Sequence, residues 1–108
     1  WSNENRSQLI RIPAAVDEYK RIELRSPDPE SNPYLAFALI IHACLYGVEK
    51  GLKLCKPSDF NLFTADLTTL SKFERLPSDL KEAAAAAHES EFIRKHIPDA
   101  IISSYCNR

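Results

Sequence analysis

Near its start the chain reads N-R-S-Q-L-I-R-I-P over residues 5–13, and further on it reads R-I-E-L-R over residues 21–25. Apolar and charged residues alternate in both stretches, which is the period-two pattern of a strand with one apolar and one polar face. The connection over residues 13–20 is too long for a two-residue turn. The two stretches therefore predict a β-hairpin with an open loop.

Four arginines and one glutamate lie on these strands or next to them: Arg6, Arg11, Arg21, Glu23 and Arg25. Guanidinium groups are planar, permanently charged forks that suit bidentate binding of phosphate and carboxylate oxygens. Glu23 stands between two arginines and is a candidate ligand for a divalent metal. Arg6 lies an odd number of positions before Arg11, so we expect it on the lead-in to the strand or beyond a bulge. Taken alone, such alternation is more often a solvated face of weak ion pairs than a site.

A long helix is predicted after the hairpin. Asn32 followed by Pro33 is a favourable N-cap and first-turn pair, and the helix is expected to end near Gly47 or Gly51. It is apolar on nearly every side, a pattern that usually means burial on every side, although two strands and a few small helices can scarcely supply that cover. Three of its aromatic side chains are expected in the core: Tyr34, Phe37 and Tyr46.

Shorter helices are expected over residues 79–88, over residues 91–96 and after Pro98. Consecutive alanines favour the first of these, with Ser78 as its N-cap. Residues 52–76 mix turn residues with scattered apolar ones, and we expect an irregular segment packed by four of them: Phe60, Leu62, Phe63 and Leu67. The predicted fold class is α+β, with a β-hairpin in residues 1–32 and a helical region in residues 33–108.

Composition excludes several classes of partner. Fourteen basic and fifteen acidic residues leave a net charge of −1 and no basic field for nucleic acid. The longest apolar run, residues 34–41, is far below the ~20 residues that cross a bilayer, so no membrane partner is expected. Cys44, Cys55 and Cys106 form no metal-binding or disulfide pattern, which favours reduced cytosolic thiols. The absence of methionine and the opening at Trp1 suggest a segment of a longer protein.

Three blocks in order resemble the carboxyl-terminal part of the catalytic domain of glutamine synthetases. They are N-R-S-x-x-I-R-I-P, R-I-E-L-R-S-P-D-P and the N-P-Y-L-A of residues 32–36. The resemblance extends from Asn5 to about Gly47 and is looser beyond, where it rests on Asn61-Leu62-Phe63 and a helical tail. It implies an excised part of that domain, with residues 1–32 as an active-site hairpin.

The resemblance implies an enzyme that ligates ammonia to glutamate in an ATP-dependent reaction through γ-glutamyl phosphate, with Mg²⁺ or Mn²⁺. It implies that Arg11 and Arg21 bind ATP phosphates and that Glu23 ligates the metal. Arg6 would be catalytic at the transferring phosphoryl group and also contact glutamate, whose carboxylate Arg25 would bind. The other metal ligands would lie upstream, so the isolated chain is expected to be inactive. The family further implies a cytoplasmic homo-oligomer.

Two other readings stay open. A related γ-glutamyl ligase acting on another amine would share the ATP and glutamate machinery, and its amine-specific residues would lie outside this segment. A non-catalytic homologue with a structural or interaction role is the second, although all four arginines and Glu23 are present. Some bacterial members are adenylylated on a tyrosine in an N-L-Y segment. Phe63 stands there in this chain and has no hydroxyl, so we expect that control to be absent.

Overall fold

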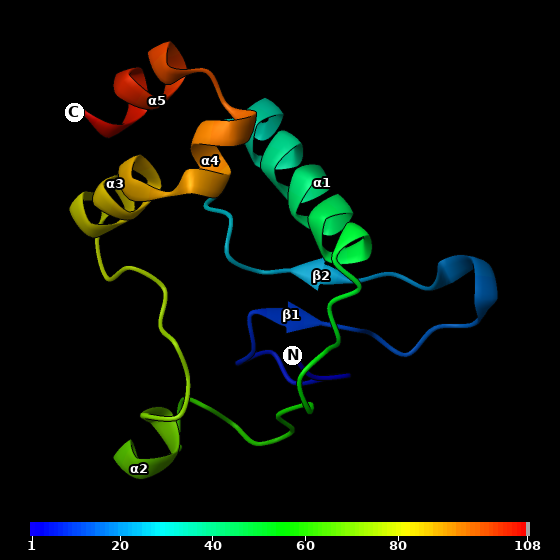
Figure 1. The fold of residues 1–108 in the computed structure, drawn as a ribbon. Helices are drawn as coiled ribbons and strands as arrows, with labels where there is room; N and C mark the ends of the chain where they lie inside the picture. The colour runs from blue at the N-terminus through cyan, green and yellow to red at the C-terminus, as the bar shows by residue number, and fades with distance from the viewer. Residues whose placement is uncertain (108) are drawn as a thin grey trace.

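The computed structural model describes residues 1–107 as a two-stranded antiparallel hairpin followed by five α-helices (Figure 1). The strands are β1 (Ile10–Arg11) and β2 (Glu23–Leu24), and the loop between them contains one 3₁₀ turn, η1 (Asp17–Tyr19). Each strand is two residues long. The predicted α+β class and the open hairpin are confirmed.

The hairpin ladder pairs Ile10 with Leu24 and Arg11 with Glu23. A third segment lies along the other edge of β1, where Ser2 forms a parallel bridge to Arg11. Its backbone N–H donates to the carbonyl of Ile10 at 3.1 Å, and its own carbonyl accepts from Ile12 at 2.9 Å. The beginning of the chain therefore extends the hairpin into a small three-segment layer.

Helix α1 (Pro33–Glu49) begins and ends as the sequence predicts. The side chain of Asn32 accepts hydrogen bonds from two backbone N–H groups of the first turn. At the other end Gly51 has φ +59°, the left-handed conformation that glycine adopts without strain. The N–H of Leu52 then donates to the carbonyl of Gly47 at 3.0 Å, which closes a Schellman motif.

The remaining helices are α2 (Leu67–Leu70), α3 (Leu80–Glu89), α4 (Glu91–His96) and α5 (Asp99–Cys106). Helix α4 has the predicted bounds, and α3 starts one residue later than predicted. The N-cap is Asp79 and not Ser78, because the Asp79 carboxylate accepts from the N–H of Glu82 at 2.8 Å. Ser78 instead donates its N–H and hydroxyl to the carboxylate of Glu82, both at 2.9 Å.

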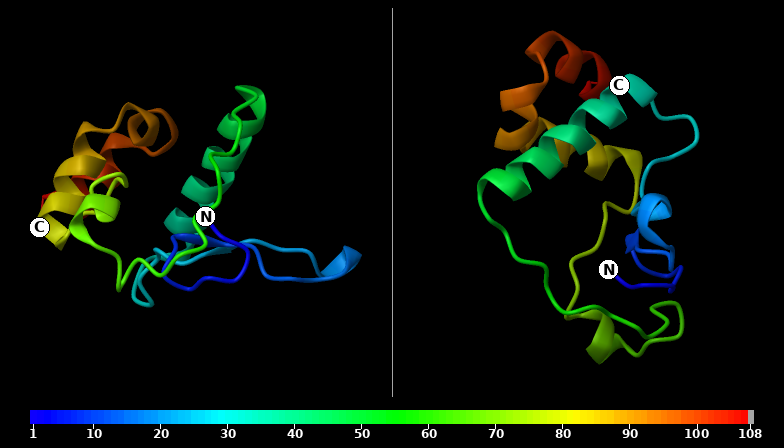
Figure 2. Two further views of the ribbon diagram at one scale, coloured as in Figure 1. Left: turned by 90° about the horizontal axis from the view of Figure 1, so that it is seen from below. Right: turned by 90° about the vertical axis from the view of Figure 1, so that its right-hand side faces the viewer.

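The elements form an open arrangement. Figure 2 shows the hairpin and the helical part as two regions joined by thin loops, and within the helical part α1 contacts α4. The radius of gyration is 15.7 Å, against about 13 Å for a compact domain of this length. The accessible surface is 9073 Å², against about 6,100 Å² for a folded monomer of 12.3 kDa. Much apolar surface therefore has no cover within residues 1–107.

The predicted core is wrong in two places. Tyr34 and Phe37 of α1 are 86% and 65% exposed, and Tyr46 is 43% exposed. Phe60, Phe63 and Leu67 are also exposed, and Phe60 makes one edge contact with Phe73 at 5.8 Å between ring centroids. A helix that is apolar all round needs neighbours on every side, and α1 has its helical contacts with α4.

None of the helices in the described residues combines the length and apolarity needed to span a lipid bilayer.

We predict that the chain associates with itself through the exposed face of α1. Five exposed apolar residues recur every three or four positions on this face: Tyr34, Phe37, Ile41, Leu45 and Val48. Sedimentation equilibrium at micromolar concentration should show dimers or larger species. The variant Phe37→Lys/Ile41→Lys should shift them towards monomer, because it places two charges in the contact. Val16→Lys, in the exposed hairpin loop, is the control and should leave the mass unchanged. A wild-type chain that is monomeric throughout would contradict the prediction.

Candidate functional site

Strand alternation and register bring four charged side chains to one face of the hairpin. Arg21, Glu23 and Arg25 alternate along β2 and its flanks, and Arg11 lies directly across from Glu23. The Arg11 Nε to Glu23 Oε2 distance and the Arg11 Nη2 to Glu23 Oε1 distance are both 2.8 Å, which is a bidentate pair. Arg21 Nη2 lies 3.7 Å from the same Oε1. One carboxylate thus orients two guanidinium groups.

The electrostatics of this face are set by the arginines. Hydrogen bonds from Arg11 hold the pKa of Glu23 below its ordinary value, and the charges of Arg11, Arg21 and Arg6 lower it further, while desolvation opposes the shift. Glu4 is near enough to raise the pKa of Arg11, after the larger effect of Glu23. Four guanidinium charges against these two carboxylates leave the face positive. It therefore attracts anions.

Arg6 lies in a turn just before β1, which confirms the predicted lead-in position. Its backbone carbonyl accepts a hydrogen bond from Nη1 of Arg25, so the two residues are joined across the hairpin end. The Arg6 side chain is exposed, and its guanidinium has no hydrogen-bond or ion-pair partner within residues 1–107. Arg6 can therefore bind an incoming anion without first giving up an internal contact.

The part of the chain that the structure describes does not complete a metal site by itself. Within residues 1–107 no three His, Cys, Asp or Glu side chains group closely enough to hold a metal. Both oxygens of Glu23 accept from Arg11, although a carboxylate has about four lone-pair positions and can accept further partners. A hard divalent cation needs about six oxygen ligands. Residues 1–107 therefore contain no complete set of protein ligands for such a cation.

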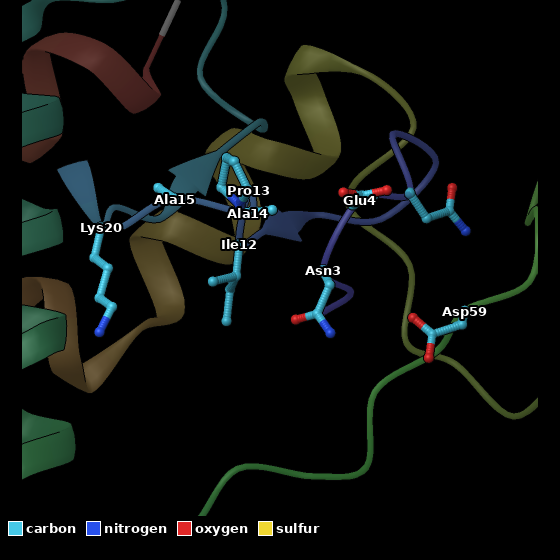
Figure 3. Close-up of a pocket in the computed structure, with 9 residues that line it drawn as sticks. Asn3, Glu4, Ile12, Pro13, Ala14, Ala15, Lys20 and Asp59 are labelled. Carbon is cyan, nitrogen blue, oxygen red and sulfur yellow. The ribbon is translucent and has the colours of Figure 1, made fainter. Parts of the chain in front are cut away.

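A hollow of about 720 Å³ lies beside the hairpin (Figure 3). Ile12 and the following loop line one side of it, and Asn3 and Asp59 line the other. Among its lining residues are none of the four arginines, all of which the structure describes. The arginine face therefore lies outside this hollow, which is a neighbouring feature that the sequence did not predict. Apart from Asp59, its lining residues all come from the first twenty residues.

Sequence reasoning also missed how the start of the chain is anchored. The indole N–H of Trp1 donates to the carbonyl of Cys55, and the Trp1 carbonyl accepts from the N–H of Ser58, both at 2.8 Å. The N–H of Leu62 donates to Oγ of Ser7 at 2.9 Å. The sequence carries only a local signal here, which is the asparagine two residues before a serine at residues 5–7. An asparagine in such a position can form an Asx turn. The distant partners carry no mark in the sequence.

The described residues thus form an α+β segment that gathers four arginines on and beside one hairpin. Over residues 1–108 the chain matches the family described as glutamine synthetase, catalytic domain. The chain belongs to this family, as the resemblance in its sequence predicts.

Curated glutamine synthetases are similar to it along nearly its whole length. The identity is 43% to that of Methanosarcina mazei, over 97% of this chain. It is 38% to that of Staphylococcus aureus, over 99%, and 37% to that of Clostridium saccharobutylicum, over 97%. Each match covers 24% of the relative, so the chain spans about a quarter of the length of the proteins that it matches.

We predict that Arg11 controls the titration of Glu23. A carboxyl whose pKa is lowered in the folded state stabilises that state above its ordinary pKa, and this contribution is lost as the pH falls through the lowered value. The pH midpoint of the Glu23 carboxyl titration, followed by its ¹³C shift, should lie below the ordinary range of a glutamate in the wild type. In Arg11→Ala this midpoint should rise. Lys20→Ala, which removes only the exposed pair with Asp17 at 3.6 Å, is the control. Equal midpoints in the wild type and Arg11→Ala would refute the ion pair.

Proposed function

We propose that this chain is the arginine-bearing part of the active site of an ATP-dependent glutamate–ammonia ligase. The observation that carries the proposal is the positive hairpin face, on which Arg11 and Arg21 contact the Glu23 carboxylate and Arg25 binds the backbone of Arg6, whose guanidinium is unpaired within residues 1–107. Membership of the glutamine synthetase family supports the substrates ATP, glutamate and ammonia. The parent protein is proposed to be cytoplasmic and homo-oligomeric.

In the proposed reaction the γ-phosphoryl group of ATP passes to the side-chain carboxylate of glutamate and forms γ-glutamyl phosphate and ADP. Ammonia then attacks the acyl carbon and displaces phosphate, which yields glutamine. Negative charge concentrates on the transferring group throughout the first step, and positioned cationic donors stabilise such charge. The chemistry therefore needs several guanidinium groups close together.

We assign ATP phosphates to Arg11 and Arg21, the transferring phosphoryl group and glutamate to Arg6, and the glutamate carboxylate to Arg25. The pair with Glu23 uses Nε and Nη2 of Arg11, which orients the fork and leaves three of its five N–H donors for ligands. Arg6 needs no internal contact to be broken. These geometries are consistent with anion binding at the open face.

Glu23 is proposed as one carboxylate ligand of Mg²⁺ or Mn²⁺, with the remaining ligands outside this chain. Lone pairs not used by Arg11 are available for this role. A cation bound there would neutralise charge on phosphate oxygens. The adenylylation that acts on a tyrosine in some relatives is proposed to be absent, because position 63 is phenylalanine.

The isolated chain is expected to release no phosphate above blank when it is incubated with ATP, glutamate, ammonia and Mg²⁺ or Mn²⁺. The reason is that a single carboxylate cannot hold the cation. A malachite-green phosphate assay measures this directly. Steady release that disappears in Glu23→Ala would show that the segment is sufficient for activity.

In the complete enzyme Arg25→Ala and Arg21→Ala are expected to weaken different substrates. Loss of a charge-assisted contact costs about 1.5–3 kcal/mol, which is roughly a ten- to hundredfold change in apparent affinity. Steady-state kinetics should show that Arg25→Ala mainly raises KM for glutamate and that Arg21→Ala mainly raises KM for ATP. The opposite pattern would reverse the two roles. Turnover with another amine but not with ammonia would instead favour the alternative ligase.

A further inference from the structure

Asn5 and Ser7 stand on either side of Arg6 and bind a loop that is distant in the chain. Nδ2 of Asn5 donates to the carbonyl of Phe60 at 2.5 Å, and the N–H of Leu62 donates to Oγ of Ser7 at 2.9 Å. The Ser7 hydroxyl in turn donates to Oδ1 of Asn5 at 2.8 Å, and the same oxygen accepts the Ser7 N–H at 2.9 Å. We call these four hydrogen bonds the Asn5–Ser7 network.

The Asn5–Ser7 network needs an amide and a hydroxyl at these two positions. The amide of Asn5 donates to the Phe60 carbonyl through its nitrogen while its oxygen accepts from Ser7, which an ionised carboxylate cannot do. The hydroxyl of Ser7 likewise donates once and accepts once. Asn5, Ser7 and Leu62 are half-buried, so a donor left unpaired by substitution has reduced access to water. The pattern is specific and not a general polar contact.

The residue between them is held at its backbone and free at its side chain. The Arg6 carbonyl accepts from Nη1 of Arg25, and the N–H of Asn5 donates to Oγ of the buried Ser2 at 2.8 Å. The Arg6 guanidinium, by contrast, is exposed and unpaired within residues 1–107. Fixing the backbone of Arg6 restricts the region that its guanidinium can reach, and positioning of this kind contributes to catalysis.

We infer that Asn5 and Ser7 are positioning residues, which hold Arg6 in place for catalysis by binding its flanking backbone to the loop at Phe60 and Leu62. The inference rests on the proposed function of Arg6. It adds that residues 60–62 are part of the support of the active site. Disturbing this loop therefore alters turnover, although the loop itself supplies no charged group to the reaction.

Kinetics of the full-length enzyme test the inference. Ser7→Ala and Asn5→Asp should each lower kcat about ten- to a hundredfold, because misplacing a catalytic group costs turnover more than substrate binding. Ser7→Thr keeps the hydroxyl and should retain most of kcat. Ser71→Ala is the matched control, since its hydroxyl donates only to the carbonyl of Thr68 at 2.9 Å. Equal losses in Ser7→Thr and Ser7→Ala would overturn the role of the hydroxyl.

A double-mutant cycle separates positioning from general damage. If Ser7 acts through Arg6, Ser7→Ala should have little further effect on kcat in an Arg6→Ala background. A full additional loss in that background would show that Ser7 acts independently of Arg6 and would refute the inference.

Hydrogen exchange supplies a readout that does not depend on activity. In Ser7→Ala the amide of Leu62 should exchange faster than in the wild type, and in Ser71→Ala it should not. Unchanged exchange at Leu62 would disprove the network. Faster exchange with unchanged kcat would show that the network has a structural role and would overturn the positioning role. A wild-type enzyme that makes no glutamine would refute the proposed function and with it the role of Arg6, while exchange would still report on the network.

Discussion

The register of β1 against β2 is the constraint on which the charged face depends. Pairing Arg11 with Glu23 places the arginines that flank β2, Arg21 and Arg25, on the same side as Arg11. A slip of one residue would turn every side chain of one strand to the opposite face. The ladder is only two residues long, so further contacts have to hold it. The bidentate Arg11–Glu23 pair and the hydrogen bond from the N–H of Arg25 to the carbonyl of Leu9, at 2.9 Å, both do so.

The hairpin region and the helical region of the described chain are each stabilised by a different kind of contact. Around the hairpin three of the four buried residues are polar, namely Ser2, Gln8 and Ser58 beside Pro13, and hydrogen bonds join the first segment to residues 55–62. In the helical part the buried residues are Ile97 and Ile102, which are apolar. Hydrogen bonds are directional and fix atoms relative to one another, whereas apolar burial is not directional. The catalytic assignments fall in the region that is fixed by directional contacts.

The open shape agrees with the place of this chain in its family. Relatives are about four times as long, and the surface of the described residues exceeds that of a compact domain by roughly 3,000 Å². Helix α1 shows this most clearly, because it is apolar all round and yet exposes Tyr34 and Phe37. A helix of this kind is usually buried on several sides, and its neighbours within this chain cover it only in part. The apolar surface of α1 therefore fits an environment with more neighbours than this segment provides.

Local physical rules determined much of this protein from sequence alone: the alternation of the two strands, the Asn32 cap, the glycine end of α1 and the arginine-rich face. These features depend on residues close together in the chain or on side-chain period. The cover of α1, the exposure of Phe63, and the contacts of Asn5 and Ser7 with Phe60 and Leu62 were decided only by tertiary structure. Their partners are backbone groups or surfaces many residues away, and every residue carries a backbone N–H or carbonyl, so no side-chain pattern marks which one will be chosen.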